Sequence, residues 1–314
     1  MDSNKRPQNQ NNSVYDAESI KVLKGLEGVR KRPAMYIGDT GENGLHHLIF
    51  EVIDNSIDES LAGFCDKIDI IINSDNSIEI IDNGRGIPIG KHPEYDKYTP
   101  EVILEHLHAG GKFDSKAYRI SGGLHGVGLS VVCALTEKLI VEIKREGQFY
   151  RQKFSKGVSV SEAEIIKLPE NEVNITETKI SFYPDNEIFD FNPEDDIWNI
   201  TKISNRVREL AFLNPNTKFT ILNENIEEPI EYHFKGGLID FVSFLNRNKK
   251  LLIPTPIYFK RSFIRKRESG PEEIVVEVAM QYNQSYGTNI LTFVNTINTI
   301  EGGTHLTGFK TALS

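Results

Sequence analysis

The sequence has few of the features that define several classes of protein. It contains only two cysteines, Cys65 and Cys133, which lie far apart and form no CxxC pair. This pattern indicates neither a disulfide framework nor a zinc site. No apolar run approaches the roughly 18 residues of a membrane-spanning helix, and the N-terminus lacks the apolar core of a signal peptide. These absences predict a cytoplasmic protein with no membrane contact.

Basic residues are also in the minority, and the net charge of −9 argues against a general nucleic-acid-binding protein. The balance reverses in residues 232–314, which hold ten Lys and Arg against six Asp and Glu. Eight of these basic residues follow one another without an acidic residue between them: Arg247, Lys249, Lys250, Lys260, Arg261, Arg265, Lys266 and Arg267. This stretch is either a solvated loop face or a surface that follows nucleic-acid phosphates.

The length of 314 residues predicts about two domains. Residues 1–14 are rich in Asn, Gln and Ser, which predicts a flexible tail, and the charge shift suggests a domain boundary near residue 231. Between them, periodicity and turn residues predict several elements. These are a helix over 44–61, a hairpin of strands 67–73 and 77–82, a short helix over 100–108, strands near 137–155 and 178–183, a helix over 197–212, and a hairpin within 214–231.

Polar residues follow one line along the predicted helix 44–61. Glu51, Asn55 and Asp58 fall at i, i+4 and i+7, so their side chains share a stripe beside apolar neighbours. The stripe could be an ordinary exposed face. Because the helix is largely apolar, however, we expect it to be buried, and buried carboxylates and amides need partners such as a metal, water or a ligand.

The segment Asp82-Asn83-Gly84-Arg85-Gly86 places a carboxylate at the end of a predicted strand. The glycines allow the backbone to approach a ligand closely, and the aspartate could accept a hydrogen bond from an amine such as that of adenine. Asp, Asn and Gly are also ordinary turn residues, so this motif alone fits a simple turn as well.

A glycine loop, Gly122-Gly123-Leu124-His125-Gly126-Val127-Gly128, leads directly into a predicted helix over 129–135. Its backbone N–H groups could bind a phosphate. The loop is not a P-loop, because Leu129 stands where that motif requires lysine, and no GxGxxG opens a βαβ unit. Glycine loops before helices are common, so this motif alone is weak.

In combination and in this order, the three motifs resemble the Bergerat-type (GHKL) ATP-binding family. That family includes type II topoisomerases, ninety-kilodalton heat-shock chaperones, MutL-type repair proteins and sensor histidine kinases. Longer segments are similar to the B subunits of bacterial DNA gyrases, over residues 15–26, 29–40, 107–114 and 301–305. The resemblance runs from Tyr15 to the end of the chain.

The resemblance implies an α+β fold. A two-layer Bergerat sandwich with a mixed sheet and helices on one face would occupy residues 15–231, with an N-terminal dimerisation arm, and a truncated part of an α/β transducer domain would occupy 232–314. The implied function is that of the ATP-binding region of a type II DNA topoisomerase. ATP-driven closure of a homodimer would couple hydrolysis to DNA strand passage and negative supercoiling.

The resemblance also implies roles for individual residues. Glu51 would be the general base, Asn55 would ligate Mg²⁺, and Asp82 would bind the adenine amine. Asp58 and Thr178 would support the polar network around the base. The other implied ATP-binding residues are Gly123, Leu124, His125, Gly126, Val127 and Gly128 around the triphosphate, Lys112 and Tyr118 on a lid, and Arg85, Gly86, Ile87, Pro88 and Ile103 around the adenine. Tyr15 and Ile20 would reach the nucleotide of a second subunit.

The implied partners are the A subunit of DNA gyrase, in an A2B2 heterotetramer, and double-stranded DNA along the basic stretch. An aminocoumarin-type inhibitor would overlap the Asp82 and Arg85 region. One departure is that the family's Gln-Thr-Lys signature, whose lysine reaches the γ-phosphate, does not occur in the sequence. We therefore expect a fragment that binds Mg·ATP with weak or no hydrolysis.

Three alternatives to a gyrase B subunit stay open. The B subunit of topoisomerase IV has the same site residues. An ATP-regulated GHKL clamp or chaperone would lack the arm, which the segment from Tyr15 to Thr40 provides here. A histidine kinase would need a phosphoacceptor helix upstream, where only a short polar tail lies.

Overall fold

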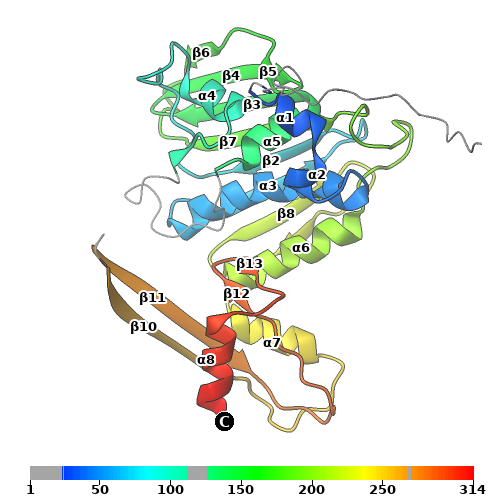
Figure 1. Cartoon of the computed structure of the whole chain (residues 1–314), viewed down its shortest axis with the longest axis vertical. Helices are drawn as coiled ribbons and strands as arrows, with labels where there is room; N and C mark the ends of the chain where they lie inside the picture. Colours follow the sequence, from blue (N-terminus) through cyan, green and yellow to red (C-terminus); the bar gives the residue numbers. More distant parts are fainter. Residues whose placement is uncertain (1–22, 24, 112–125, 268–269) are drawn as a thin grey trace, which may run out of the picture.

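The computed structural model describes residues 23, 25–111, 126–267 and 270–314. Within these ranges one sheet of nine strands dominates the fold (Figure 1). Its strands are β1 (Lys67–Ile72), β2 (Ile78–Asp82), β3 (Thr136–Arg145), β4 (Gln148–Ser155), β5 (Val158–Ser159), β6 (Glu164–Lys167), β7 (Glu177–Pro184), β8 (Lys218–Asn223) and β9 (Ile230–Tyr232). Their order is β5-β4-β3-β7-β2-β1-β8-β9, with β6 also paired to β4.

The sheet is mixed, as predicted. The strand pairs are antiparallel except for β1 and β8, which run parallel. Alternate residues of the central strands are buried, including Ile68 and Ile70 of β1. On the other face Lys179 pairs with Glu79 at 2.8 Å and with Glu142 at 3.5 Å. This alternation of apolar and charged residues is typical of a sheet with one face packed and one face in water.

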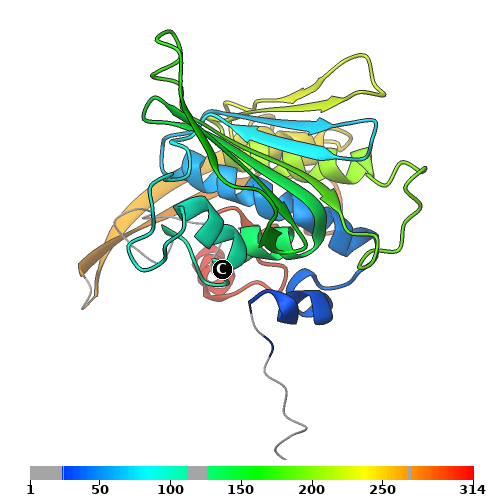
Figure 2. The ribbon, with the colours of Figure 1, turned by 90° about the horizontal axis from the view of Figure 1, so that it is seen from above.

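Helices form the second layer. They are α1 (Glu27–Lys31), α2 (Ala34–Ile37), α3 (Glu42–Leu61), α4 (Thr99–Glu105), α5 (Gly128–Ala134) and α6 (Ile200–Leu213). Figure 2 shows α3 and α5 against the same face of the sheet. The helix α3 buries its apolar residues in the core, among them Leu48, Ile49 and Ile53. None of the helices in the described ranges combines the length and the apolar character needed to cross a bilayer.

The rest of the described chain extends from α6. It contains α7 (Leu238–Asn246), β10 (Ile257–Arg267), β11 (Gly270–Met280), β12 (Phe293–Val294), β13 (Ile297–Asn298) and α8 (Thr304–Leu313). Strands β10 and β11 form a long hairpin that projects away from the main sheet (Figure 1). Phe212 of α6 stacks on Phe234 and on Phe241 of α7, with ring centroids 3.8 and 4.8 Å apart. Stacked aromatic rings therefore join the two parts.

The α+β, two-layer prediction is confirmed, and each helix and strand predicted up to residue 231 has a counterpart. The helix predicted over 100–108 ends at Glu105, and the one predicted over 197–212 begins at Ile200. The helices α1 and α2, the short strands β5 and β6, and all the elements that follow β9 were not predicted individually. The domain boundary at residue 231 stays a prediction, and β9 continues one residue past it to Tyr232. The predicted tail, residues 1–14, lies outside the described residues.

Candidate nucleotide-binding site

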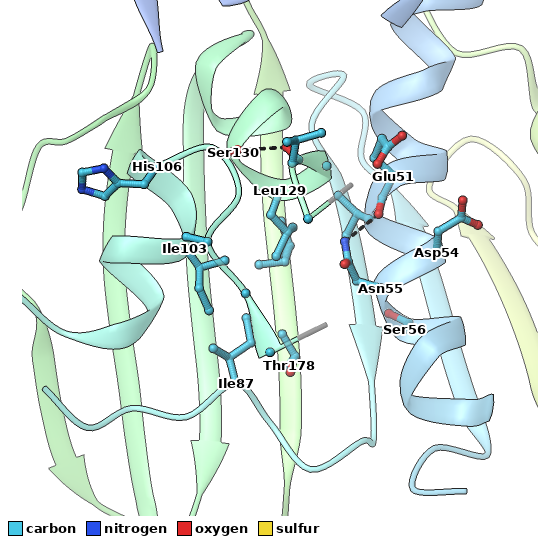
Figure 3. Close-up of a pocket in the computed structure, with 18 of the residues that line it drawn as sticks. Glu51, Asp54, Asn55, Ser56, Ile87, Ile103, His106, Leu129, Ser130 and Thr178 are labelled. Carbon is cyan, nitrogen blue, oxygen red and sulfur yellow. Dashed lines mark hydrogen bonds between the residues drawn. The ribbon is translucent and has the colours of Figure 1, made fainter. Parts of the chain in front are cut away.

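A cavity of about 1340 Å³ opens between α3, α4, α5 and the loop that follows β2. Most of the sequence-predicted site residues that the structure describes line it: Glu51, Asn55, Asp82, Arg85, Gly86, Ile87, Pro88, Ile103, Gly126, Val127, Gly128 and Thr178. Figure 3 shows how they are grouped, with Glu51 and Asn55 on α3 across the cavity from Ile87 and Ile103. The fold thus brings together three motifs that are widely separated in the sequence.

Asp58 is placed differently from these residues. It is fully buried on α3 and does not line the cavity, so any support it gives to the polar network would be indirect. Several predicted positions lie outside the described residues: Tyr15, Ile20, Lys112, Tyr118, Gly123, Leu124 and His125.

One end of the cavity is built on the sheet around Asp82. This residue ends β2 and is the register partner of Thr178 on β7. Ser56 donates a hydrogen bond from its Oγ to Asp82 Oδ2 at 2.8 Å, and the Gly84 N–H donates to Oδ1 at 2.9 Å. Burial raises the pKa of Asp82 to about 6. At neutral pH the group is therefore a buried carboxylate that faces the cavity, which suits it to accept a hydrogen bond from an amine.

Arg85 and Gly86 form the edge of the cavity beside Asp82, and hydrogen bonds hold both residues in place. The Arg85 side chain donates from Nε and Nη2 to the Glu59 carboxylate at 3.0 and 2.8 Å, and its guanidinium lies 4.0 Å from the centroid of the Phe64 ring. Arg145 donates to the Gly86 carbonyl at 2.7 Å. Gly86 has φ +75°, and a Cβ there would lie 2.9 Å from the Lys144 carbonyl, so only glycine fits without strain.

Glu51 and the glycine end of α5 form the opposite end of the cavity. A Cβ on Gly128 would lie 2.1 Å from Glu51 Oε2, so the carboxylate lies directly against the Gly128 backbone. His47 Nε2 lies 3.0 Å from Glu51 Oε1, one helical turn before it on α3. The arrangement places a carboxylate, with its orientation fixed by an imidazole, beside backbone that lines the cavity.

His47 and Glu59 are among the residues that sequence reasoning missed at this site, as are Asp54 and Ser56. His47 and Glu59 lie on the helical line that contains Glu51 and Asn55, at steps of four residues. Extending the predicted stripe by one turn in each direction would have found them.

We expect the His47 imidazole to report the state of Glu51. The hydrogen bond to Glu51 raises the pKa of His47 above its ordinary value of 6.5. In the Glu51→Gln variant this partner loses its charge, so the pKa of His47 should fall. Two-dimensional NMR titration of the imidazole in both proteins measures the difference. An identical titration of His47 in the two proteins would contradict the pairing.

The predicted basic stretch does not form one continuous face. Arg247 directly follows the last residue of α7 and stacks on Phe244 at 4.0 Å from the ring centroid, while Lys249 and Lys250 follow in the next turn. Along β10 the side chains alternate between the two faces of the hairpin. Lys260 and Lys266 share one face, Arg261 and Arg265 share the other, and Arg267 ends the strand. Lys260 also lies 3.8 Å from Glu277 across the hairpin.

Comparisons with known proteins agree with this geometry. Residues 40–179 match the family described as histidine kinase-, DNA gyrase B- and HSP90-like ATPase, and residues 237–314 match the DNA gyrase B family. The DNA gyrase B subunit of Clostridium acetobutylicum is 50% identical over 303 residues, which is 96% of this chain and 45% of the relative. That of Thermotoga maritima is 48% identical over 96% of this chain and 46% of its own length.

A solved structure of a gyrase B domain is also similar to this chain. It is the 43K ATPase domain of Thermus thermophilus gyrase B in complex with an aminocoumarin, with a TM-score of 0.78 and 38% identity over 94% of this chain and 72% of that chain. The fold and the site thus define a protein of the GHKL ATPase class. Within that class, the chain belongs to the DNA gyrase B family. It spans about half the length of the curated relatives reported above.

Proposed function

We propose that the chain is the ATP-binding region of a type II DNA topoisomerase of the gyrase type. The observation that carries the proposal is the placement of Asp82 and Glu51 around one cavity, with glycine backbone beside each. The buried Asp82 carboxylate would accept the adenine amine, and Glu51 would act as the general base for attack of water on the γ-phosphorus. The relatives are DNA gyrase B subunits by name, which favours this function over topoisomerase IV.

The nucleotide would bind together with Mg²⁺. The Asn55 side chain lines the cavity, and its Nδ2 donates to the Glu51 carbonyl at 2.6 Å, which fixes the orientation of the amide. An amide oxygen is an acceptable ligand for Mg²⁺, which usually takes one or two protein ligands together with substrate phosphates. The described residues hold no cluster of three or more His, Cys, Asp or Glu that could bind a metal by themselves. Mg²⁺ bound at Asn55 would neutralise phosphate charge.

In the complete enzyme, ATP binding would close a homodimer of this protein around a DNA duplex, together with the A subunit of gyrase, and couple hydrolysis to strand passage and negative supercoiling. Such a DNA substrate would place the activity in the cytoplasm. The likeness to an aminocoumarin complex supports binding of that inhibitor class near Asp82 and Arg85. The basic residues on β10 would contact DNA through phosphates, without reading its sequence.

The expected result of nucleotide binding is dimerisation. Light scattering should give the monomer mass of 35.5 kDa for the chain alone and twice that mass with Mg²⁺ and a non-hydrolysable ATP analogue. A ligand that contacts both protomers stabilises only the closed state. Removing residues 1–20 should abolish the shift in mass and leave binding of the analogue measurable by calorimetry. A monomer that binds the analogue at saturation would contradict closure by this region.

A further inference from the structure

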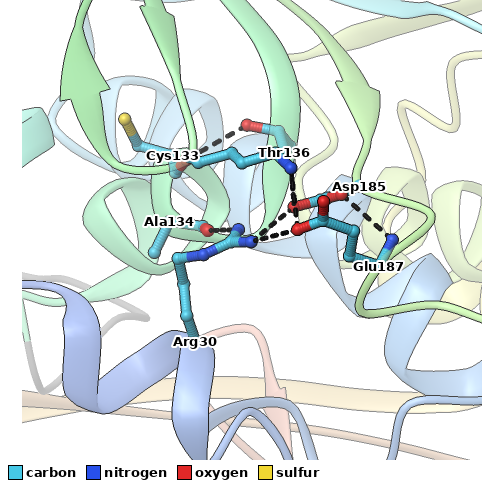
Figure 4. A network of polar contacts seen from close by, with 7 residues as sticks. Arg30, Cys133, Ala134, Thr136, Asp185 and Glu187 are labelled. Carbon is cyan, nitrogen blue, oxygen red and sulfur yellow. Dashed lines mark hydrogen bonds and ion pairs between the residues drawn. The ribbon is translucent and has the colours of Figure 1, made fainter.

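A network of charged residues lies at the Ala134 end of α5 (Figure 4). The residues that line the cavity, 126–130, lie at the other end of this helix. Arg30 of α1 donates from Nη1 to the carbonyl of Ala134, the last residue of α5, at 2.8 Å. Its Nη2 lies 2.7 Å from Asp185 Oδ2, just after β7. The Asp185 side chain is only 1% exposed. A single guanidinium therefore connects α1, the end of α5 and the end of β7.

This network holds a buried charge. Burial by itself would raise the pKa of Asp185, but the Glu187 N–H, which donates at 3.0 Å, and the Arg30 guanidinium together lower it below its ordinary value. Lys156 is the second cation, 2.8 Å from Glu187 but 3.6 Å from Asp185. Without Arg30 the buried carboxylate would keep the Glu187 N–H but only this longer contact with a cation, which is unfavourable for a buried charge.

The helix α5 connects this network to the cavity. It is seven residues long, which corresponds to about 10 Å at 1.5 Å per residue. Its last four residues, 131–134, are buried, so it packs as a rigid piece. At its other end Gly126, Val127 and Gly128 line the cavity, and Gly128 lies against Glu51. Ser130 donates to the Val127 carbonyl at 2.9 Å, which joins the glycine segment to the helix. A displacement of the Ala134 end would therefore move the cavity end as well.

We propose that Arg30 is a positioning residue for the triphosphate. By bridging the last carbonyl of α5 and the charged Asp185, its guanidinium fixes how far the Gly126–Gly128 backbone extends into the cavity beside Glu51. This inference rests on the proposed binding of ATP and adds to it a residue outside the cavity. Displacements near 1 Å in a binding site can change rates by as much as a hundredfold. A contact that holds the Ala134 end of α5 can therefore affect binding at the cavity end of the same helix.

The placement of the adenine end makes the proposal specific. Asp82 ends β2, and its register partner Thr178 lies at the start of β7, at the opposite end of that strand from Asp185. Arg30 therefore reaches the adenine end only through the length of a paired strand. Loss of Arg30 should therefore weaken contacts with the phosphates and leave contacts with the base unchanged. A purely structural role would weaken the binding of every ligand of the cavity alike.

The test compares two ligands in matched variants of the 314-residue chain. Adenosine probes the base contacts, and a non-hydrolysable ATP analogue with Mg²⁺ probes base and phosphates together, both by titration calorimetry. In Arg30→Ala the affinity for the analogue should fall about tenfold, as expected for a displacement well below 1 Å. Adenosine affinity should change less than about twofold, within the scatter between mutants at independent sites.

Arg30→Lys keeps the charge without the planar fork, so its affinity for the analogue should lie between that of the unchanged protein and that of Arg30→Ala. Lys31→Ala, at an exposed position next along α1, is the matched control and should match the unchanged protein.

Glu187→Gln keeps the test valid if Arg30→Ala does not fold. Glu187 accepts from Arg30 Nη2 at 3.3 Å and is largely exposed, so this variant should fold and show a smaller loss for the analogue alone. Equal losses for both ligands, or unchanged affinity for the analogue in folded Arg30→Ala or Arg30→Lys, would overturn the inference and leave ATP binding intact. An unchanged protein that bound neither ligand would overturn the proposed function together with the inference.

Discussion

Replacing Glu51 by Gln is expected to reduce ATP turnover by about a hundred- to ten-thousand-fold, the usual contribution of a positioned general base, while leaving nucleotide affinity nearly unchanged. Gln has the same shape as Glu and preserves the contact with Gly128, where a Cβ would lie only 2.1 Å from Oε2. Unlike a carboxylate, its amide cannot accept a proton from the attacking water. The effect should therefore fall on the chemical step and leave binding intact.

Single-turnover measurements with protein in excess over ATP record even slow hydrolysis, and calorimetry with the non-hydrolysable analogue measures affinity. Glu42→Gln is the matched control, because Glu42 begins the same helix but does not line the cavity. We expect this control to turn over ATP like the unchanged protein. If Glu51→Gln hydrolysed ATP at the unchanged rate, the general base would be a different group, and Asp54 would be the next candidate because it is another carboxylate of α3 that lines the cavity.

The core of the site could be predicted because its signals are local. Helical geometry alone places Glu51 and Asn55 on one face of α3, and the pattern of a strand ending in Asp82 followed by glycines survives intact in the structure. The register of β2 with β7, which makes Thr178 the neighbour of Asp82, is not local. It depends on which strands pair, and a single sequence contains no signal for that choice, so Thr178 entered only through the family resemblance.

His47 and Glu59 were missed despite a local signal on α3, whereas long-range contacts account for the missed network around Arg30. Arg30 and Glu187 are 157 positions apart and Arg30 and Ala134 are 104 apart, so no periodicity connects them. The basic stretch shows the opposite case, because residues close in sequence lie on different surfaces. Lys260, Arg261, Arg265 and Lys266 lie on β10 and point alternately to the two faces of a hairpin, whereas Arg247, Lys249 and Lys250 follow α7. Whether a charged run forms one surface depends on its secondary structure, and the β-branched and aromatic residues within 257–264 were the available signal.

Replacing Asp82 by Asn is expected to weaken ATP binding and to stabilise the protein. In the variant the side-chain oxygen must still accept from the Gly84 N–H, which donates to Oδ1 at 2.9 Å. The new NH₂ then occupies the position of Oδ2, beside Ser56 and facing the adenine amine, so two donors meet. Because hydrogen bonds to charged groups contribute about 1.5 to 3 kcal/mol, ATP affinity should fall roughly ten- to a hundredfold or slightly more.

The stabilisation follows from the raised pKa of Asp82, which is about 6 because of burial. Ser56 and Gly84 oppose this shift with hydrogen bonds, whereas the charges of Glu59 and Glu177 add to it. The native state binds this proton more tightly than the unfolded chain, where the value is 3.8. The free energy of unfolding therefore falls as pH rises from about 4 to 6, and this loss of stability remains at neutral pH. It amounts to about 3 kcal/mol, which Asn avoids by carrying no charge.

Thermal or denaturant unfolding at pH 7 and pH 4, beside calorimetry with the ATP analogue, tests both effects in one variant. The gain in stability should be present at pH 7 and shrink towards pH 4, where Asp82 is protonated in the folded protein.

Asp75→Asn is the matched control: Asp75 accepts from the Ser77 N–H in the β1–β2 turn, and its pKa is lowered mainly by hydrogen bonds to Ser77. That variant should lose stability at pH 7 and keep its affinity. If Asp82→Asn bound ATP with unchanged affinity, another group would recognise the adenine. If it lost affinity without gaining stability, the buried charge of Asp82 would not destabilise the folded protein.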